Sequence, residues 1–200
     1  LGITDEGTLT VGGNLSATTA AGNGVITLNE LTLTGTISLA TNDAANNNTG
    51  HAVVINSTGL KFADIRVEGD LNATASNGAV TQTLGEMDVE GTTIIAVTTA
   101  NDVTLDVPSN DFKGALSITG SAKDVKIKDI SALNLGAVTA TGDYSVYAGG
   151  NITDSGAQVI TGEAAFVTDG DLPTLTVNAG SSTALTENEV ITGGSSGATG

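Results

Sequence analysis

Cysteine is absent from the 200 residues, which excludes disulfide scaffolds, thiolate metal sites and cysteine nucleophiles. Positive charge is scarce, because six Lys and Arg stand against 22 Asp and Glu. The resulting net charge of −16 would repel a phosphate backbone, so we expect no nucleic-acid partner. No apolar run approaches the roughly 18 residues of a membrane-spanning helix, and we expect no membrane span in this segment.

Aromatic residues are also rare, at 2% of the chain, and tryptophan is missing. A single round core is usually anchored by large rings that each bury about 150–250 Å². Yet 39% of the residues are hydrophobic and only 14% are charged, which is not the composition of a disordered chain. We therefore expect a long, thin core of stacked Val, Ile, Leu and Ala.

Apolar and polar residues alternate in many short segments, as in half-buried β-strands. Clear examples are residues 8–11, 31–34, 36–39, 102–107 and 123–128. Gly and Asn, which supply the positive φ of tight turns, separate these segments. No amphipathic helical stripe is present, and the sequence predicts an all-β chain.

Three stretches of the sequence align with one another, at residues 11–18, 67–74 and 140–147. Each is followed by a second strand that ends in glycine. The spacings are 22 residues from Gly13 to Gly35, 22 from Gly69 to Gly91 and 20 from Gly142 to Gly162. A period of this length is typical of a solenoid.

A solenoid with coils of about 20–22 residues would pair each strand in parallel with its equivalent in the next coil, a parallel β-helix. We expect residues 1–200 to be a single β-solenoid segment of a longer repetitive chain. The Asn-rich run at residues 42–50 breaks the rhythm, and we expect it to be a projecting loop.

Catalytic patterns are weak in this sequence. His51 is the single histidine, and it is not accompanied by a Gly-x-Ser-x-Gly elbow, so we interpret it as an exposed loop residue. Paired carboxylates could serve a polysaccharide lyase or hydrolase. With one arginine, Arg66, and no tryptophan to bind sugars, we expect no enzymatic activity.

Glu86, Asp88 and Glu90 alternate with apolar residues, so their carboxylates should line one face of a strand. Oxygen ligands of this kind suit Ca²⁺, which makes the three residues weak calcium candidates. The alternative is a solvated outer face. We expect no other metal or cofactor.

Two further surface features concern partners and modification. Lys123, Lys126 and Lys128 concentrate half of the positive charge, which could dock an acidic neighbour or simply form an exposed strand face. The Asn-x-Ser/Thr pattern permits N-glycosylation only where the host has the machinery. It occurs at Asn14, Asn47, Asn56, Asn72 and Asn151.

The stretch from residue 110 to 156 carries a family resemblance. It contains NDFKGALSITG at 110–120, ALNLG at 132–136 and GGNITDSG at 149–156. These motifs resemble the repeats of bacterial filamentous-haemagglutinin-like adhesins, which are exoproteins often exported by two-partner secretion. The resemblance implies a right-handed parallel β-helix shaft outside the cell.

The leading hypothesis is therefore a structural or adhesive protein of the bacterial cell surface or extracellular matrix. Its partners would be a host or neighbouring cell surface, a matrix polysaccharide or identical subunits. A self-assembling surface-layer or filament subunit is the alternative, and a β-helix polysaccharide lyase or hydrolase is a third hypothesis. An ice-binding solenoid is the most distant one, since the Thr-x-Thr pairs do not recur at a regular coil interval.

Overall fold

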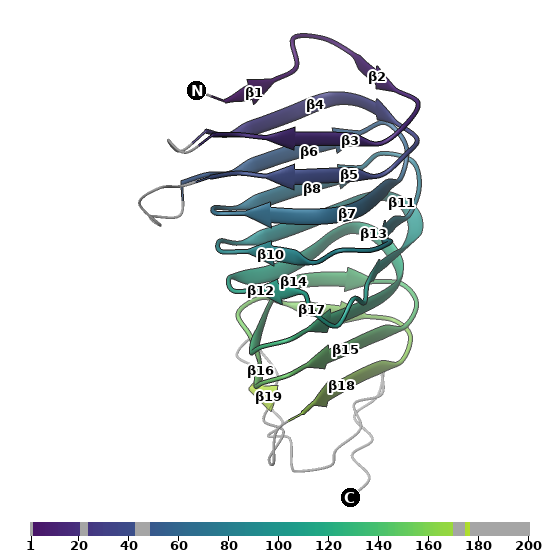
Figure 1. Cartoon of the computed structure of the whole chain (residues 1–200). Coiled ribbons are helices and arrows are strands. Elements are labelled where there is room, and N and C mark those ends of the chain that lie inside the picture. The colour runs from purple at the N-terminus through teal and green to yellow at the C-terminus, as the bar shows by residue number, and fades with distance from the viewer. Residues whose placement is uncertain (1, 21–23, 43–48, 170–174, 177–200) are drawn as a thin grey trace, which may run out of the picture.

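A computed structural model describes residues 2–20, 24–42, 49–169 and 175–176 (Figure 1). Over these ranges the chain is all-β and winds into a right-handed parallel β-helix of about seven turns. No helix in this part of the chain is long and apolar enough to cross a membrane. Most of the run expected to project as a loop, residues 43–48, lies outside the described residues.

Each full coil presents three faces, which we number in chain order. The first face holds β1 (Ile3–Thr4), the first part of β4 (Ile26–Leu33), β6 (Ala52–Asn56), β8 (Leu71–Ala75), the first parts of β11 (Thr93–Leu105) and β13 (Ala115–Asp129), β14 (Leu133–Ala140), β16 (Ile152–Asp154), β17 (Gln158–Ile160) and β19 (Leu175–Thr176). The second face holds β2 (Leu9–Val11), the end of β4, the start of β7 (Leu60–Val67), β9 (Val80–Gln82), the second parts of β11 and β13, β15 (Tyr144–Ala148) and β18 (Ala164–Thr168). The third face holds β3 (Leu15–Thr18), β5 (Ile37–Ala40), the end of β7, β10 (Met87–Val89) and β12 (Asp111–Phe112).

All the described strand pairs are parallel, and each joins one coil to the next. The hydrogen bonds beside these pairs show how far the chain travels in one coil. Thr92 bonds Asp70 of the coil before it, 22 positions earlier in the sequence. The separation is shorter between His51 and Asp70, at 19 positions, and longer between Ser38 and Asp64, at 26. The predicted solenoid is thus confirmed, with coils that vary more in length than the glycine spacing indicates.

The core consists of aliphatic columns that run along the solenoid axis. Inward side chains stack in register from coil to coil, because every residue pairs with its equivalent one strand spacing away. One column is Leu28, Val54, Ala73, Ile95 and Ile118, all at most 2% exposed. This is the long, thin core that the scarcity of aromatic residues predicts.

Few aromatic side chains enter the core, and they do so at separate levels. Phe62, Phe112 and Tyr144 are fully buried. Tyr144 meets the ring of Phe166 edge to face at 5.6 Å, and burial raises the pKa of its hydroxyl. Each ring fills one level of the stack, and the rings do not form a common cluster.

The glycine pairs of the repeats stack directly on one another. A Cβ atom on Gly35 would lie 2.2 Å from the carbonyl oxygen of Gly13, so only glycine fits there. The amide of Gly91 donates to Gly69 O, and that of Gly162 donates to Gly142 O. The spacing between the two glycines of each pair is therefore the length of one coil.

The three aligned stretches do not all occupy one column, contrary to the simplest interpretation of the repeat. β3 pairs with β5, whereas β8 pairs with β6 and β11, and β15 pairs with β13 and β18. The shared motif is a local corner that recurs on different faces. Alignment detects this corner because the same turn is used wherever the chain changes face.

The coils that follow β12 are short as far as β18. β12 is the last strand of the third face in the described part of the chain, and from β13 to β16 the second face leads directly back to the first (Figure 1). The separation between bonded residues of neighbouring coils falls accordingly, from 23 positions between Glu90 and Lys113 to 19 between Asp124 and Asp143. The solenoid is narrower there.

Candidate functional site

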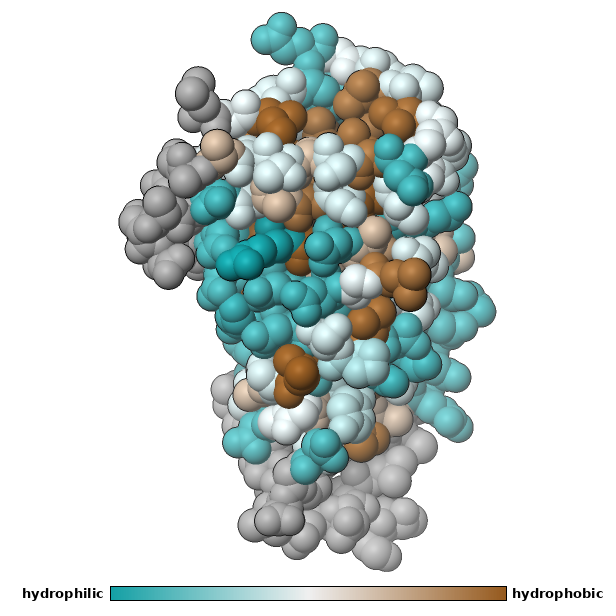
Figure 2. Space-filling model, viewed as in Figure 1, coloured by the Kyte–Doolittle hydropathy of each residue, from teal (hydrophilic) through white to brown (hydrophobic). Residues whose placement is uncertain are grey.

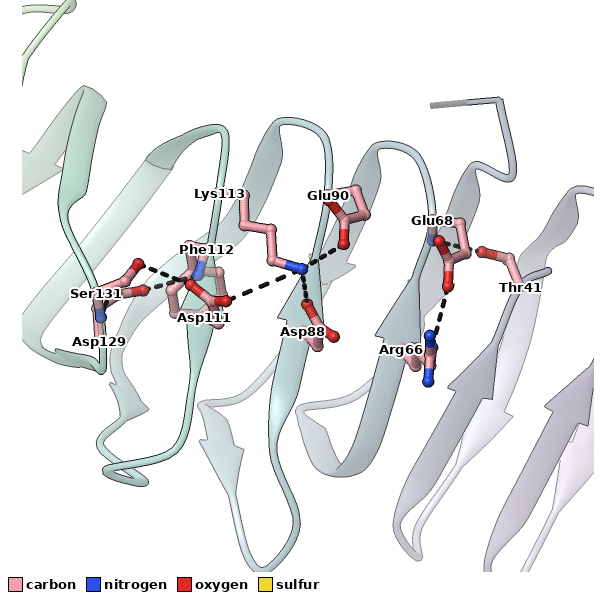
Figure 3. A network of polar contacts seen from close by, with 10 residues as sticks. All are labelled: Thr41, Arg66, Glu68, Asp88, Glu90, Asp111, Phe112, Lys113, Asp129 and Ser131. Atoms are coloured by element: carbon pink, nitrogen blue, oxygen red, sulfur yellow. Dashed lines mark hydrogen bonds and ion pairs between the residues drawn. The ribbon is translucent and has the colours of Figure 1, made fainter. Parts of the chain in front are cut away.

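The third face carries a ladder of charged side chains that crosses several coils (Figure 3). Arg66, Asp88 and Asp111 occupy one outward column, since Asp88 pairs with Arg66 on one side and Asp111 on the other. Their neighbours in the strands, such as Val67, Val89 and Phe112, point into the core. Strand alternation thus places the whole set on the solvent side.

Lys113 is the cation at the centre of this ladder. Its Nζ lies 2.8 Å from Asp88 Oδ1 and 3.9 Å from Asp111 Oδ2, and it also donates to Glu90. Partial burial opposes its charge, but the hydrogen bonds with Asp88 and Glu90 outweigh this effect and raise the pKa of Lys113. One ammonium therefore neutralises carboxylates from two successive coils.

Arg66 and Glu68 form a second pair on β7 and the corner that follows it. Arg66 Nε donates to Glu68 Oε1 at 3.0 Å, and this hydrogen bond raises the pKa of Arg66. The backbone amide of Glu68 donates to Thr41 Oγ1, which itself donates to the carbonyl of Gly50 at 2.6 Å. The pair is held in place from the coil before.

Asp129 lies at the other end of the ladder and is fully buried. Its Oδ2 accepts from the amide of Phe112 at 2.7 Å, and its Oδ1 accepts from the amide of Ser131 at 2.8 Å. Burial raises the pKa of this carboxyl, although both backbone donors act in the opposite direction. Ser131 also donates to Asp111 Oδ1, which connects Asp129 to the ladder.

The calcium candidates Glu86, Asp88 and Glu90 fall on this ladder. Asp88 and Glu90 share Lys113, and Glu86 is exposed in the residue before β10. In the described part of the chain, no group of three or more acidic or histidine side chains is placed to hold a metal ion. Lysine occupies the position between two of the carboxylates, and calcium binding there stays a prediction.

His51 belongs to a corner, where its ring is 42% exposed. Its Nδ1 accepts a hydrogen bond from the amide of Asp70 at 2.8 Å, so this nitrogen carries no proton. The carboxylate of Asp70 lies 3.3 Å from the same nitrogen. The histidine joins two coils in this arrangement.

Asn and Asp side chains connect successive coils at the corners, a role that the sequence analysis did not assign to the repeated Gly-Asx motif. Asn14 Oδ1 accepts from the amide of Thr36, and Asp70 Oδ1 accepts from that of Thr92. At another corner the acceptors form a column in which Asp102, Asp124 and Asp143 receive the amides of Asp124, Asp143 and Glu163. The sequence signal for Asn14, Asp70 and Asp143 was their place directly after the first glycine of each repeat pair. Asp102 and Asp124 follow no glycine and carried no such signal.

Lys126 and Lys128 of the predicted lysine cluster share the outward side of β13, because they alternate with the buried Val125 and Ile127. Lys123 lies at a corner, where its hydrogen bond lowers the pKa of Asp124. Lys126 Nζ pairs with Asp106 Oδ2 at 2.8 Å on the second face. These contacts match an exposed strand face with paired charges.

The glycosylation sequons differ in accessibility. Asn56 is fully buried, and its amide nitrogen donates to Leu33 O and Gly59 O, so it is not available for modification in the folded chain. Asn14, Asn72 and Asn151 are exposed, and Asn47 lies outside the described residues.

A shallow hollow of about 240 Å³ lies at the corner between the first and second faces. Its lining combines the apolar side chains of Leu31 and Ile55 with polar side chains, which are Thr8, Asn29, Glu30, Thr32, Ser57 and Ser76. Such a surface can hydrogen-bond a small polar ligand.

Comparison with known proteins identifies repeats only. A family model described as repeats of unknown function (DUF5649) matches residues 50–119 and again residues 122–190, which is well over half of the chain. No curated protein and no solved structure matches. The boundary between the two matches lies within β13, about three coils after the first begins.

Proposed function

The chain belongs to the DUF5649 repeats of unknown function, and from this premise we propose that it is a structural or adhesive shaft of a bacterial cell surface or extracellular matrix. The observation that carries the proposal is the parallel strand pairing, which bonds each described coil to the next from β1 to β19. Such a stack bears load along its axis through many backbone hydrogen bonds at once.

The corners and the third face support the same role. Carboxylates that accept backbone amides hold each turn of the chain to the turn above it, as Asp70 does for Thr92. Lys113 joins acidic side chains of neighbouring coils in the same way. Both devices act between coils, which suits a molecule whose task is to stay extended and folded.

The resemblance of residues 110–156 to filamentous-haemagglutinin-like repeats supports the extracellular and adhesive part of the proposal. The acidic, cysteine-free surface is compatible with secretion and with solubility outside the cell. Contacts with a cell surface or a polysaccharide would then be made by side chains displayed along the shaft.

The test uses the organism that encodes the chain. Antibodies raised against the purified chain should label intact cells, and an in-frame deletion of the segment should reduce attachment to surfaces. A strain in which the segment is replaced by an unrelated folded domain serves as the control. Labelling that requires permeabilised cells, or attachment equal to that of the parent strain, would overturn the proposal.

A further inference from the structure

Among the described residues, the first face of the solenoid carries no charge at its outward paired positions. These positions form two columns in register from coil to coil. The columns are Thr4, Thr27, Val53, Asn72, Ile94 and Ser117, and Ile55, Thr74, Ala96 and Thr119. Every one of them is hydroxylic, amidic or aliphatic.

The charge of the molecule is displaced to other surfaces, and teal hydrophilic side chains gather over the third face in Figure 2. The third face holds the ladder around Lys113, and one corner holds the acidic column of Asp102, Asp124 and Asp143. With a net charge of −16, two copies that approach through those surfaces repel each other. The first face is where two copies can meet without bringing like charges together.

Three exposed aliphatic side chains also lie on this face. Ile55 is 36% exposed and Ile94 is 38% exposed, on neighbouring columns. Farther along, Val159 is 56% exposed and pairs with Thr139, whose strand β14 continues the same face. Covering these side chains removes apolar surface from water, which favours association.

The composition of the first face favours contact with another protein surface over contact with a polysaccharide or with ice. Sugar rings and crystalline polysaccharides are bound by stacked aromatic side chains, and neither column contains one. An ice-binding face requires an unbroken threonine ladder, whereas Val53, Asn72 and Ile94 interrupt the first column. Another sheet of mixed threonine and aliphatic residues packs well against such a surface.

The size of the face is sufficient for a specific contact. Seven strand levels at about 4.8 Å and five residues at about 3.3 Å give roughly 34 Å by 17 Å. Two such faces bury on the order of 1,200 Å² in total, which exceeds the roughly 1,000 Å² of a stable interface.

We propose that the first face is the contact surface through which two copies of this chain pack side by side. The solenoids pair sheet to sheet, with Asn72 and Ile94 near the centre of the contact. This goes beyond the shaft role, because a solenoid can act as a shaft alone or in pairs.

The experiment compares two charge insertions on a single strand. Ile94→Glu places a carboxylate on the first face, and Thr104→Glu places one at an outward position of the second face, both in β11. In sedimentation equilibrium the parent chain and T104E should show twice the chain mass of 19.6 kDa. The dissociation constant of the I94E dimer should be at least ten times that of the parent dimer. Circular dichroism checks that both variants retain the solenoid.

Engineered cysteines give a second readout, because the chain has none of its own. On mild oxidation Asn72→Cys should form a covalent dimer, and Thr104→Cys should not. A parent chain that sediments as a monomer at 100 µM, or equal cross-linking of both variants, would overturn the proposal. Loss of pairing together with unchanged labelling of intact cells would leave the shaft proposal standing.

Discussion

At the corners of this solenoid, single side chains accept the backbone hydrogen bonds that have no partner in the paired strands. Where the chain changes face, backbone amides point along the axis without a partner carbonyl, and an Asx oxygen of the preceding coil accepts them. Asn14 and Asp70 do this with different chemistry but the same geometry. The neutral amide shows that the acceptor, rather than the charge, is what the corner needs.

Asp70→Ala should therefore lower the free energy of unfolding by about 1 kcal/mol, because it leaves the amide and hydroxyl of Thr92 without their acceptor. Asp70→Asn keeps an oxygen at the position and should cost much less. Urea unfolding followed by circular dichroism measures both. If the two variants lose the same stability, the contact of Asp70 with His51 is the important one.

Strands in this molecule are completed by side chains wherever a neighbouring strand stops short. β4 and β6 pair as far as Leu31 and Asn56, and the Asn56 amide then bonds both the N–H and the C=O of Leu33. Buried Asn110 likewise accepts from the amide of Met87 and exchanges two hydrogen bonds with Gln82. Polar side chains inside the core thus continue the hydrogen bonding between strands. On the outer surface, Lys113 connects neighbouring strands through its ion pairs with Asp88 and Glu90.

Lys113→Met should destabilise the fold by about 1 kcal/mol, a modest loss because the side chain is 36% exposed. Asp88, Glu90 and Asp111 would then repel one another, and 0.5 M NaCl should screen part of the loss. The raised pKa of Lys113 means that its contribution is complete below the ordinary lysine pKa of about 10.4 and fades only above it. The deficit should accordingly be constant between pH 7 and pH 9.

Lys61→Met is the matched control, since Lys61 donates to a single backbone carbonyl, that of Thr34. Its loss should be small and independent of salt. A K113M deficit that is unaffected by salt would show that the side chain acts by packing rather than by charge.

The whole molecule is a one-dimensional stack in which each coil contacts only its neighbours. Central coils are covered on both sides, whereas β1, β2 and β3 pair on one side only among the described strands. Leu71 is fully buried, while Leu15 and Leu9 in the first coil are half-buried. In the isolated 200-residue chain, stability should therefore be greatest in the middle and decline toward the first described coil.

Leu71→Ala should cost about 2–5 kcal/mol, because it opens a cavity in a close-packed column. Leu15→Ala removes the same atoms from a half-buried side chain on β3, which pairs only with β5 among the described strands, and in the isolated chain it should cost less than half as much. Equilibrium unfolding gives the two values, and amide hydrogen exchange should show faster exchange in the first coil. Equal losses would mean that the stack unfolds without regard to position.

Strand alternation and the spacing of glycines were enough to predict an all-β solenoid and its approximate coil length from the sequence. The reason is physical, since a period of two marks a half-buried strand and a repeated corner marks each change of direction. The same reasoning placed Glu86, Asp88 and Glu90 on one outward face. It could not identify Lys113 as the partner of Asp88 and Glu90, because that contact joins residues of different coils and depends on the exact register.

What the sequence determined by itself is therefore local: which residues form strands, which side of each strand faces the core, and where the chain turns. The tertiary structure alone decided which corner follows which and that the repeats Gly13, Gly69 and Gly142 serve different faces. It also gathered the uncharged positions into one surface. Because the coils differ in length, the sequence separation between paired residues changes from coil to coil. Only the pairing of the strands in the folded chain determines which residues of successive coils lie side by side.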